Sequence, residues 1–417
     1  MNLNQVLKRG VEFYPQNIAT VDGQHRQTYS ELHARVLALA ARLQQLGVNK
    51  GDRVALLMLN GHQFAEVIFA TWTLGAVVVP LNYRLAPEEL IFILNDAECV
   101  VLITDDSLLS TTTEMRPRLI GIRHFIVTAK SQDYLDYESL AGSFQQIPCS
   151  PELDEQDLAG LFYTSGTTGL PKGVMLSHRN LWMNLMHSLV AVPGRENEVY
   201  LHAAPMFHLA DFPSLLSVTL HGGTHVTLKK FDPAAVLCLV EQETVNRMML
   251  VPTMINLLIN HGDIHRRDVS SLNTITYGAS PMPAELLKRT MLTLSHVDLY
   301  QGYGQSEASP ILARLLPQDH VVEGPEYLTR RLSSCGRPVI GVELDIFDPD
   351  DKPVAPGTVG EIVARGPNVM MGYWNNPEET ARALRGGWLH TGDAARKDEY
   401  GYYYIVDRTK DMIVTGG

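Results

Sequence analysis

The chain has 417 residues, 45% of them hydrophobic, which is enough apolar material for roughly two or three folded domains and excludes disorder as a description of the whole chain. Lys and Arg number 34 and Asp and Glu number 46, so the formal net charge is −12 and the chain lacks the basic surface that nucleic-acid partners require. The four cysteines form no CxxC pair, and no stretch reads as a signal peptide or a membrane span. These features argue against a disulfide framework or a structural zinc site and favour a cytoplasmic protein.

The first hundred residues alternate between helix and strand signals. Thr28 and Glu31 have the spacing of a capping box, and apolar residues then recur every three or four positions as far as Gly47, which suits a C-terminal cap. We therefore predict an amphipathic helix there. Beyond it we predict strands at 53–59, 76–81 and 100–104, and helices at 62–74 and 87–96. This order is typical of a mostly parallel sheet covered by helices.

The same alternation resumes after about residue 155 and continues to about 315. Asp232 followed by Pro233 predicts another helix start, with the aspartate as the cap. From Cys335 the pattern changes to short apolar runs broken by Gly, Pro and Asp. That pattern predicts a small all-β module after the α/β part of the chain.

A loop rich in glycine and hydroxyl residues carries the strongest chemical signal. The sequence YTSGTTGLPKGV, residues 163–174, follows an apolar segment and contains a single lysine, Lys172. Glycines let the backbone turn its N–H groups inward and hydroxyls add donors, so such a loop suits phosphate oxygens. Pro171 and Gly173 stand where a Walker A loop needs Gly and Ser or Thr, which disfavours a GTPase or an ordinary P-loop ATPase. Glu307 likewise interrupts a dinucleotide-binding GxGxxG pattern at 302–307.

Five further motifs follow this loop in a fixed order: PMFHLA (205–210), YGAS (277–280), QGYGQSE (301–307), TGD (391–393) and YIVDRTKDMIVTGG (404–417). With them the chain resembles the large N-terminal domain of the adenylate-forming enzymes, the superfamily of acyl- and aryl-CoA synthetases and amino-acid adenylation domains. The resemblance implies an α/β fold with two helix-covered β-sheets plus a small β-barrel. It implies one large domain over 1–408, with two α/β subdomains to about 330 and a β-barrel-like subdomain at about 335–408. Residues 409–417 would be the hinge and the start of a C-terminal domain.

The family's roles transfer to the matching residues. The loop that holds the β- and γ-phosphates of ATP corresponds to Thr164, Ser165, Gly166, Thr167, Thr168, Gly169 and Lys172. Glu307 matches the carboxylate that helps to hold Mg²⁺, and Ser306 replaces the usual threonine facing the α-phosphate. The adenine and acyl cleft corresponds to Gly278, Ala279, Ser280 and the stacking residue Tyr303. Asp393 and Arg408 match the two ribose contacts.

His208 in PMFHLA occupies a position where acyl- and aryl-CoA synthetases often have histidine, between the acid pocket and the thiol channel. Amino-acid adenylation domains have an aspartate here for the substrate ammonium, and Asp211 is three residues out of register, so we do not expect an α-amino acid. Lys410 matches the hinge residue. The resemblance also implies that the family's catalytic lysine lies in a C-terminal domain of about 100 residues beyond Gly417, so we expect little adenylation by this chain alone.

The expected function is an AMP-forming acid–CoA ligase that uses ATP, Mg²⁺ and coenzyme A. The stretch 208–214 and the apolar, Met-containing stretch 248–259 are expected to line the acid pocket, and they favour a medium- or long-chain fatty acid, with loose membrane association for a long chain. Aryl or alicyclic acids, and transfer to a carrier protein or an amine, remain alternatives. A non-catalytic nucleotide-binding protein is a remote one. The sequence leaves the oligomeric state open, including a homodimer.

Overall fold

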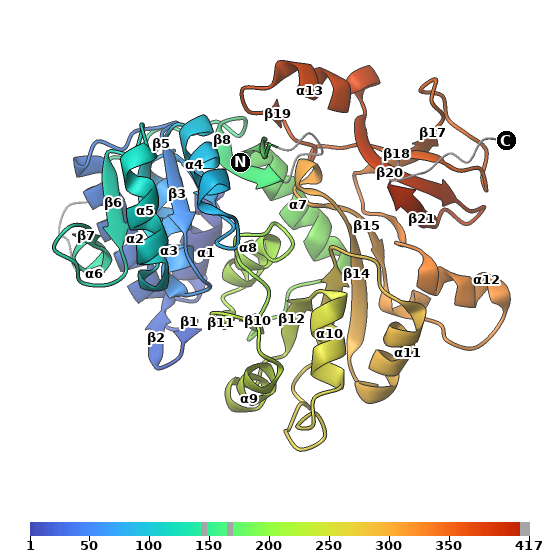
Figure 1. Cartoon of the computed structure of the whole chain (residues 1–417). Coiled ribbons are helices and arrows are strands. Elements are labelled where there is room, and N and C mark those ends of the chain that lie inside the picture. Colours follow the sequence, from blue (N-terminus) through green and yellow to red (C-terminus); the bar gives the residue numbers. More distant parts are fainter. Residues whose placement is uncertain (143–147, 165–169, 409–417) are drawn as a thin grey trace.

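The computed structural model describes residues 1–142, 148–164 and 170–408, and three β-sheets are found in this part of the chain (Figure 1). The eight-stranded sheet has the order β19-β9-β8-β4-β3-β5-β6-β7. Its strands are β3 (Arg53–Leu57), β4 (Val77–Pro80), β5 (Cys99–Thr104), β6 (His124–Val127), β7 (Leu135–Asp136), β8 (Leu158–Thr164), β9 (Lys172–Ser177) and β19 (Gly372–Tyr373). The strands from β3 to β8 pair in parallel, whereas β9 and β19 are antiparallel.

The nine-stranded sheet has the order β16-β15-β14-β13-β12-β10-β11-β1-β2. Its strands are β1 (Ile18–Asp22), β2 (His25–Thr28), β10 (Val199–His202), β11 (Thr224–Thr227), β12 (Arg247–Leu250), β13 (Thr274–Gly278), β14 (Asp298–Gly304), β15 (Ile311–Leu315) and β16 (Arg337–Pro338). The strands from β1 to β14 in this order pair in parallel, and β2, β15 and β16 are antiparallel. The predicted mostly parallel, helix-covered sheets are confirmed, although the first two strands of the chain belong to the second sheet.

The four-stranded sheet is antiparallel, with the order β17-β18-β20-β21, and consists of β17 (Glu343–Phe347), β18 (Gly360–Arg365), β20 (Leu389–Lys397) and β21 (Tyr403–Arg408). The small β module predicted from about Cys335 is confirmed as this sheet, but it is not all-β, because helix α13 (Pro377–Ala383) precedes β20, and β16 and β19 extend the two larger sheets. The helix signal is local: the Asn376 side chain caps the first turn, Pro377 follows, and two glutamates lie in that turn.

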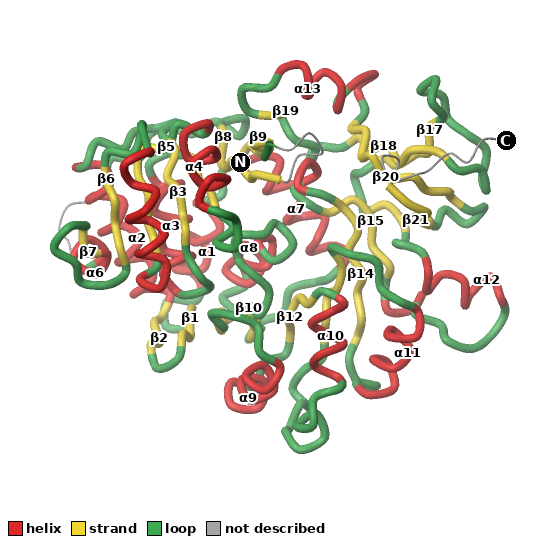
Figure 2. Tube along the Cα trace, in the orientation of Figure 1, coloured by secondary structure: helices red, strands yellow, loops and turns green. Residues whose placement is uncertain are grey.

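Helices cover both α/β sheets, as Figure 2 shows. The helices that precede β8 in the chain are α1 (Asn4–Phe13), α2 (Tyr29–Gln45), α3 (His62–Thr73), α4 (Pro87–Asp96), α5 (Leu109–Met115) and α6 (Tyr137–Ala141). The others are α7 (His178–Ala191), α8 (Phe212–Leu220), α9 (Pro233–Glu243), α10 (Pro252–Ile259), α11 (Ala284–Thr293) and α12 (Glu326–Thr329). Within the described ranges, no helix has the length and apolarity needed to cross a bilayer.

Alternation along β3 explains how the sheet is buried on both faces. Val54 and Leu56 belong to a core shared with α1, α2, α3, α7 and α8, whereas Ala55 and Leu57 pack on the opposite face with α4 and α5. A separate core joins the nine-stranded sheet to α9, α10 and α11. Helix α7 contacts β9 of the eight-stranded sheet and β15 of the nine-stranded sheet, and α8 packs against α7, so both helices lie between the two sheets. Both contribute residues to the cavity described below.

The predicted helix boundaries are confirmed where local signals were strong. The Thr28 side chain accepts a hydrogen bond from the backbone N–H of Glu31, and the Glu31 carboxylate bonds the Thr28 backbone in return. Gly47 follows the helix with φ of +84°. The Asp232 side chain accepts from the Ala235 N–H at the start of α9.

Candidate active site

The predicted phosphate loop is the tip of an antiparallel hairpin between β8 and β9. Thr164 and Lys172 are paired residues on these strands, so they flank the loop on its two sides. Ser165, Gly166, Thr167, Thr168 and Gly169 lie outside the described residues. The Lys172 ammonium forms an ion pair with Glu379 of α13 and lies 5.4 Å from the centroid of the Tyr373 ring. A carboxylate that the sequence did not identify therefore pairs with this lysine, and the same carboxylate also pairs with Arg382.

Glu307 joins the same group of residues from a different sheet. It lies with Ser306 in the short 3₁₀ turn Ser306–Ala308 that follows β14, and its Oε1 accepts a 2.8 Å hydrogen bond from the Tyr373 hydroxyl. Tyr373 reaches this place because β19 pairs with β9 beside the phosphate loop. Burial and then the charge of Glu307 raise the pKa of Tyr373, so its hydroxyl remains a donor. The predicted phosphate and metal residues thus meet around one tyrosine.

The predicted adenosine contacts also meet. The Tyr303 hydroxyl on β14 donates a 2.8 Å hydrogen bond to Oδ2 of Asp393 on β20. Burial and the neighbouring Asp393 carboxylate raise the pKa of Tyr303. The backbone of Asp393 is paired with that of Arg408 on β21, so the two predicted ribose residues occupy neighbouring strands. Lys410, the predicted hinge residue, lies outside the described residues.

Strand β13 ends at Gly278, where the sheet backbone is tightly packed, and Ala279 and Ser280 follow it. A Cβ atom on Gly278 would lie 2.3 Å from the carbonyl oxygen of Gly302, so the approach of β13 to β14 requires glycine. Ala279 has a φ of +63°. This backbone conformation is unfavourable for any residue other than glycine, and such strained residues often occur at functional sites. Ser280 is exposed.

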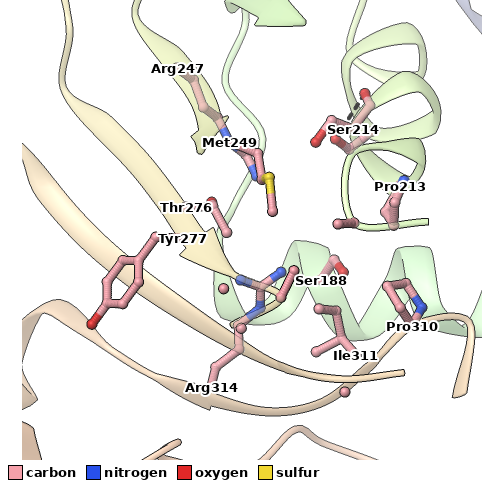
Figure 3. Close-up of a pocket in the computed structure, with 16 residues that line it drawn as sticks. Ser188, Pro213, Ser214, Arg247, Met249, Thr276, Tyr277, Pro310, Ile311 and Arg314 are labelled. Carbon is pink, nitrogen blue, oxygen red and sulfur yellow. Dashed lines mark hydrogen bonds between the residues drawn. The ribbon is translucent and has the colours of Figure 1, made fainter. Parts of the chain in front are cut away.

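A cavity of about 70 Å³ lies between the nine-stranded sheet and helices α7 and α8 (Figure 3). It joins parts of all the stretches predicted to form the acid pocket. The lining residues are Ser188, Ala210, Pro213, Ser214, Ser217, Arg247, Met249, Thr276, Tyr277, Gly278, Ala279, Gly302, Gly304, Pro310, Ile311 and Arg314. The sequence reasoning missed the two arginines, although a cation inside the apolar runs RMML and ILARL was a visible signal.

His208 is not one of the lining residues. It keeps exposed surface, and its ring packs against Phe207 with 4.3 Å between centroids. The surrounding protein displaces water from the ring and Arg84 adds a positive charge, and both effects lower the pKa of His208. Its imidazole is therefore neutral near pH 7.

Asp211 forms hydrogen bonds within the protein core and does not line the cavity. Its carboxylate accepts hydrogen bonds from the Tyr200 hydroxyl, at 2.7 Å, and from Nδ1 of His202, at 2.5 Å, and the residue is fully buried. His202 continues this chain of hydrogen bonds to His225. Because its oxygens are already engaged, Asp211 is not placed to pair with a substrate ammonium.

The Lys172–Glu379 pair leads to a prediction about ATP binding. Phosphate oxygens would have to compete with the Glu379 carboxylate for the lysine, so Glu379→Gln should tighten ATP binding, by up to about fivefold. Glu378→Gln makes the same charge change at an exposed neighbour in the same helical turn and should leave the affinity unchanged. Calorimetric titration with ATP and Mg²⁺ measures both, and equal effects of the two variants would contradict a specific role for the pair.

Comparison with known proteins gives consistent matches. Residues 7–374 match the AMP-binding enzyme family. The chain is 40% identical to a feruloyl-CoA synthase of Amycolatopsis sp., over 98% of this chain and 79% of that protein. It is 35% identical to the medium/long-chain fatty acid–CoA ligase FadD8 of Mycobacterium tuberculosis, over 95% of this chain and 69% of that protein. A solved fatty acyl CoA synthetase of M. tuberculosis superposes with a TM-score of 0.89 at 30% identity, over 100% of this chain and 80% of that one. On these grounds the chain belongs to the AMP-binding enzyme family.

Proposed function

We propose that the protein is an ATP-dependent ligase that joins a carboxylic acid to coenzyme A through an acyl-adenylate. One observation carries the proposal. Gly302 and Gly304 line the cavity, while Tyr303 between them bonds Asp393, so the acid cavity and the proposed nucleotide contacts share the end of β14. A reaction between a carboxylate and the α-phosphate of ATP needs its two substrates side by side in this way.

Each proposed role has a physical reason. Lys172, with Thr164 and the rest of the loop, would neutralise the β- and γ-phosphates, which depart as pyrophosphate. Asp393 would accept hydrogen bonds from both ribose hydroxyls. Arg408, its partner on the neighbouring strand, would be the second ribose contact, and Tyr303 would stack on adenine. Ser306 would donate to the α-phosphate, and Gly278, Ala279 and Ser280 would border the adenine and the acid. His208 would stand where the thiol enters, and Lys410 would be the hinge.

Glu307 is the residue that would hold Mg²⁺. Among the described residues, no group of three or more His, Cys, Asp or Glu side chains could hold a metal ion. Mg²⁺ in nucleotide sites uses one or two carboxylates and completes its shell with phosphate oxygens and water, so a single carboxylate fits it. The bound ion would neutralise the charge on the departing pyrophosphate.

The proposed reaction has two steps. A carboxylate oxygen of the acid attacks the α-phosphorus of ATP, an O–P bond forms, and pyrophosphate leaves with the electron pair of the broken P–O bond. The sulfur of coenzyme A then attacks the acyl carbon, AMP departs, and the thiol proton passes to solvent or a base. Neither step needs a covalent bond to the protein, so positioning and charge stabilisation supply the catalysis.

The chemical class of the carboxylic acid substrate is a separate part of the proposal. The relatives are named after feruloyl, fatty acyl and succinylbenzoate substrates, so they do not agree on one class. Met249, Pro213 and Ile311 can contact the hydrocarbon part of an alkyl or an aryl acid, so they do not choose between the medium- or long-chain fatty acid expected from the sequence and the aryl or alicyclic alternative. Transfer to a carrier protein or an amine remains the second candidate for the acceptor.

The test uses the product of the complete gene with ATP, Mg²⁺ and a pool of fatty, aryl and alicyclic acids, with and without coenzyme A. We expect mass spectrometry to detect an acyl-CoA that appears only when coenzyme A is present. If acyl-AMP forms without a thioester, the acceptor of the acyl group would be a carrier protein or an amine instead of coenzyme A. ATP binding without either product would favour a non-catalytic nucleotide-binding protein.

A further inference from the structure

The cavity contains a positive charge that nothing in the described part of the protein balances. Arg314 on β15 is 7% exposed, and its Nε and Nη1 atoms are buried without a hydrogen-bond partner in the described residues. Arg247 on β12 is equally buried, but its Nη1 lies 3.1 Å and 3.3 Å from the two carboxylate oxygens of Glu198. Among the described residues that line the cavity, none carries an acidic side chain. Two cations and one carboxylate therefore leave one uncompensated positive charge.

The position of Arg314 separates it from the proposed phosphate contacts. Ile311 is paired with Gly304, next to Ser306 and Glu307, whereas Arg314 is paired with Gly302. Arg314 stands three residues further along β15, roughly 10 Å from the Gly304 end. Figure 3 shows the side chains of Arg247 and Arg314 reaching toward the space beside Met249, while the Tyr277 ring points away. Arg314 thus faces the inner part of the cavity.

An apolar tail in this place would be unfavourable. It would displace water from a guanidinium that has no protein partner, and an unpaired buried charge is expensive. Burial, followed by the charge of Arg247, already lowers the pKa of Arg314 to about 10. A carboxylate would supply the missing charge, and its two oxygens fit the planar fork of an arginine. Ser188, whose buried Oγ also lacks a partner in the described residues, lines the same cavity and offers a further donor.

Resting on the proposed ligase function, we propose that the acid bound in this cavity is a dicarboxylate, and that Arg314 holds the carboxylate remote from the one that is activated. The rest of the cavity, with Met249, Pro213 and Ile311, contacts the hydrocarbon between the two groups. Arg247 lies on the same side and is kept in place by Glu198.

The experiment compares acids that differ only at the far end: adipate with hexanoate, suberate with octanoate, and terephthalate with p-toluate. The protein from the complete gene is given each acid with ATP, Mg²⁺ and coenzyme A, and kcat/KM is measured. We expect the better dicarboxylate to exceed its monocarboxylate partner by about 100-fold or more, because a buried polar group penalises the analogue that lacks its partner. Equal or better use of the monocarboxylates overturns the proposal.

Variants of the cavity residues test whether Arg314 causes the preference for dicarboxylates. Arg314→Met should reduce the preference at least tenfold, and Arg314→Lys, which keeps the charge, should retain most of it. Met249→Leu changes an apolar wall of the same cavity and should affect both acids alike. Arg314→Met should leave the dissociation constant of ATP within about threefold of the wild type. A larger loss of ATP affinity would place Arg314 at the nucleotide and overturn the proposal.

Calorimetric binding of the acids, measured without turnover, separates this inference from the ligase reaction. Dicarboxylate binding that disappears in Arg314→Met supports the inference even if no thioester forms. The missing thioester would then count against the proposed ligase reaction and not against the role of Arg314. Dicarboxylate binding no tighter than monocarboxylate binding in the wild type overturns the inference, whatever products are formed.

Discussion

Arg35→Met should destabilise the fold by about 3–5 kcal/mol, because it removes the cationic partner of a fully buried carboxylate. Glu66 on α3 is 0% exposed, and Arg35 on α2 donates to both of its oxygens, at 2.7 and 3.1 Å. The Tyr137 hydroxyl and the Gln27 amide complete the shell of donors, at 2.7 and 3.2 Å. Burial and the charge of Glu66 raise the pKa of Tyr137, as expected for a hydroxyl donating to a buried anion.

The matched control is an ion pair of the same chemistry at the surface. Arg26 and Glu243 lie 2.6 Å apart, but Arg26 is 48% exposed, so Arg26→Met should cost no more than about 1 kcal/mol. Urea unfolding with an unchanged m-value measures both variants. Adding Glu66→Gln to Arg35→Met should recover part of the loss, since the buried charge is then gone. Similar losses for Arg35→Met and Arg26→Met would contradict the role assigned to burial.

The Arg35–Glu66 pair illustrates which parts of the fold the sequence could predict. Helix ends were predictable because their signals are local: the Thr28 capping box and the Asp232–Pro233 start lie within one turn of what they specify. The contact between Arg35 and Glu66 joins two helices, and membership of a sheet is equally non-local. Nothing near Ile18–Asp22 indicates that β1 pairs with β11, more than two hundred residues later.

The same division applies to the candidate site. Ordered motifs led to Lys172, Glu307 and Asp393, because each motif contains its own candidate residue. The contacts of these residues come from elsewhere in the chain. Tyr373 bonds Glu307 because β19 leaves the four-stranded region to pair with β9, and Glu379 follows on α13. The cavity arginines were visible as cations in apolar strands, but which face of the sheet each side chain occupies depends on register.

Asp393→Ala should weaken ATP binding by about 100-fold or more, if this carboxylate accepts both ribose hydroxyls as proposed. A hydrogen bond to a charged group contributes about 1.5–3 kcal/mol, and two would be lost. The exposed Asp350→Ala, in the loop between β17 and β18 of the same sheet, is the matched control and should leave the affinity unchanged. Calorimetric titration with ATP and Mg²⁺ gives the dissociation constants.

The Tyr303–Asp393 hydrogen bond allows a sharper test of how Asp393 acts. Tyr303→Phe removes the hydroxyl that donates to Asp393 and keeps the ring proposed to stack on adenine. If Asp393 binds ribose directly, Tyr303→Phe should change the ATP affinity only a few-fold, whereas Tyr303→Ala should lose the stacking contribution of about 1–3 kcal/mol. Equal losses for Asp393→Ala and Tyr303→Phe would instead mean that Asp393 acts by holding the tyrosine. AMP should follow the same order of affinities across these variants, because it carries the same base and sugar without the phosphates that Lys172 is proposed to meet.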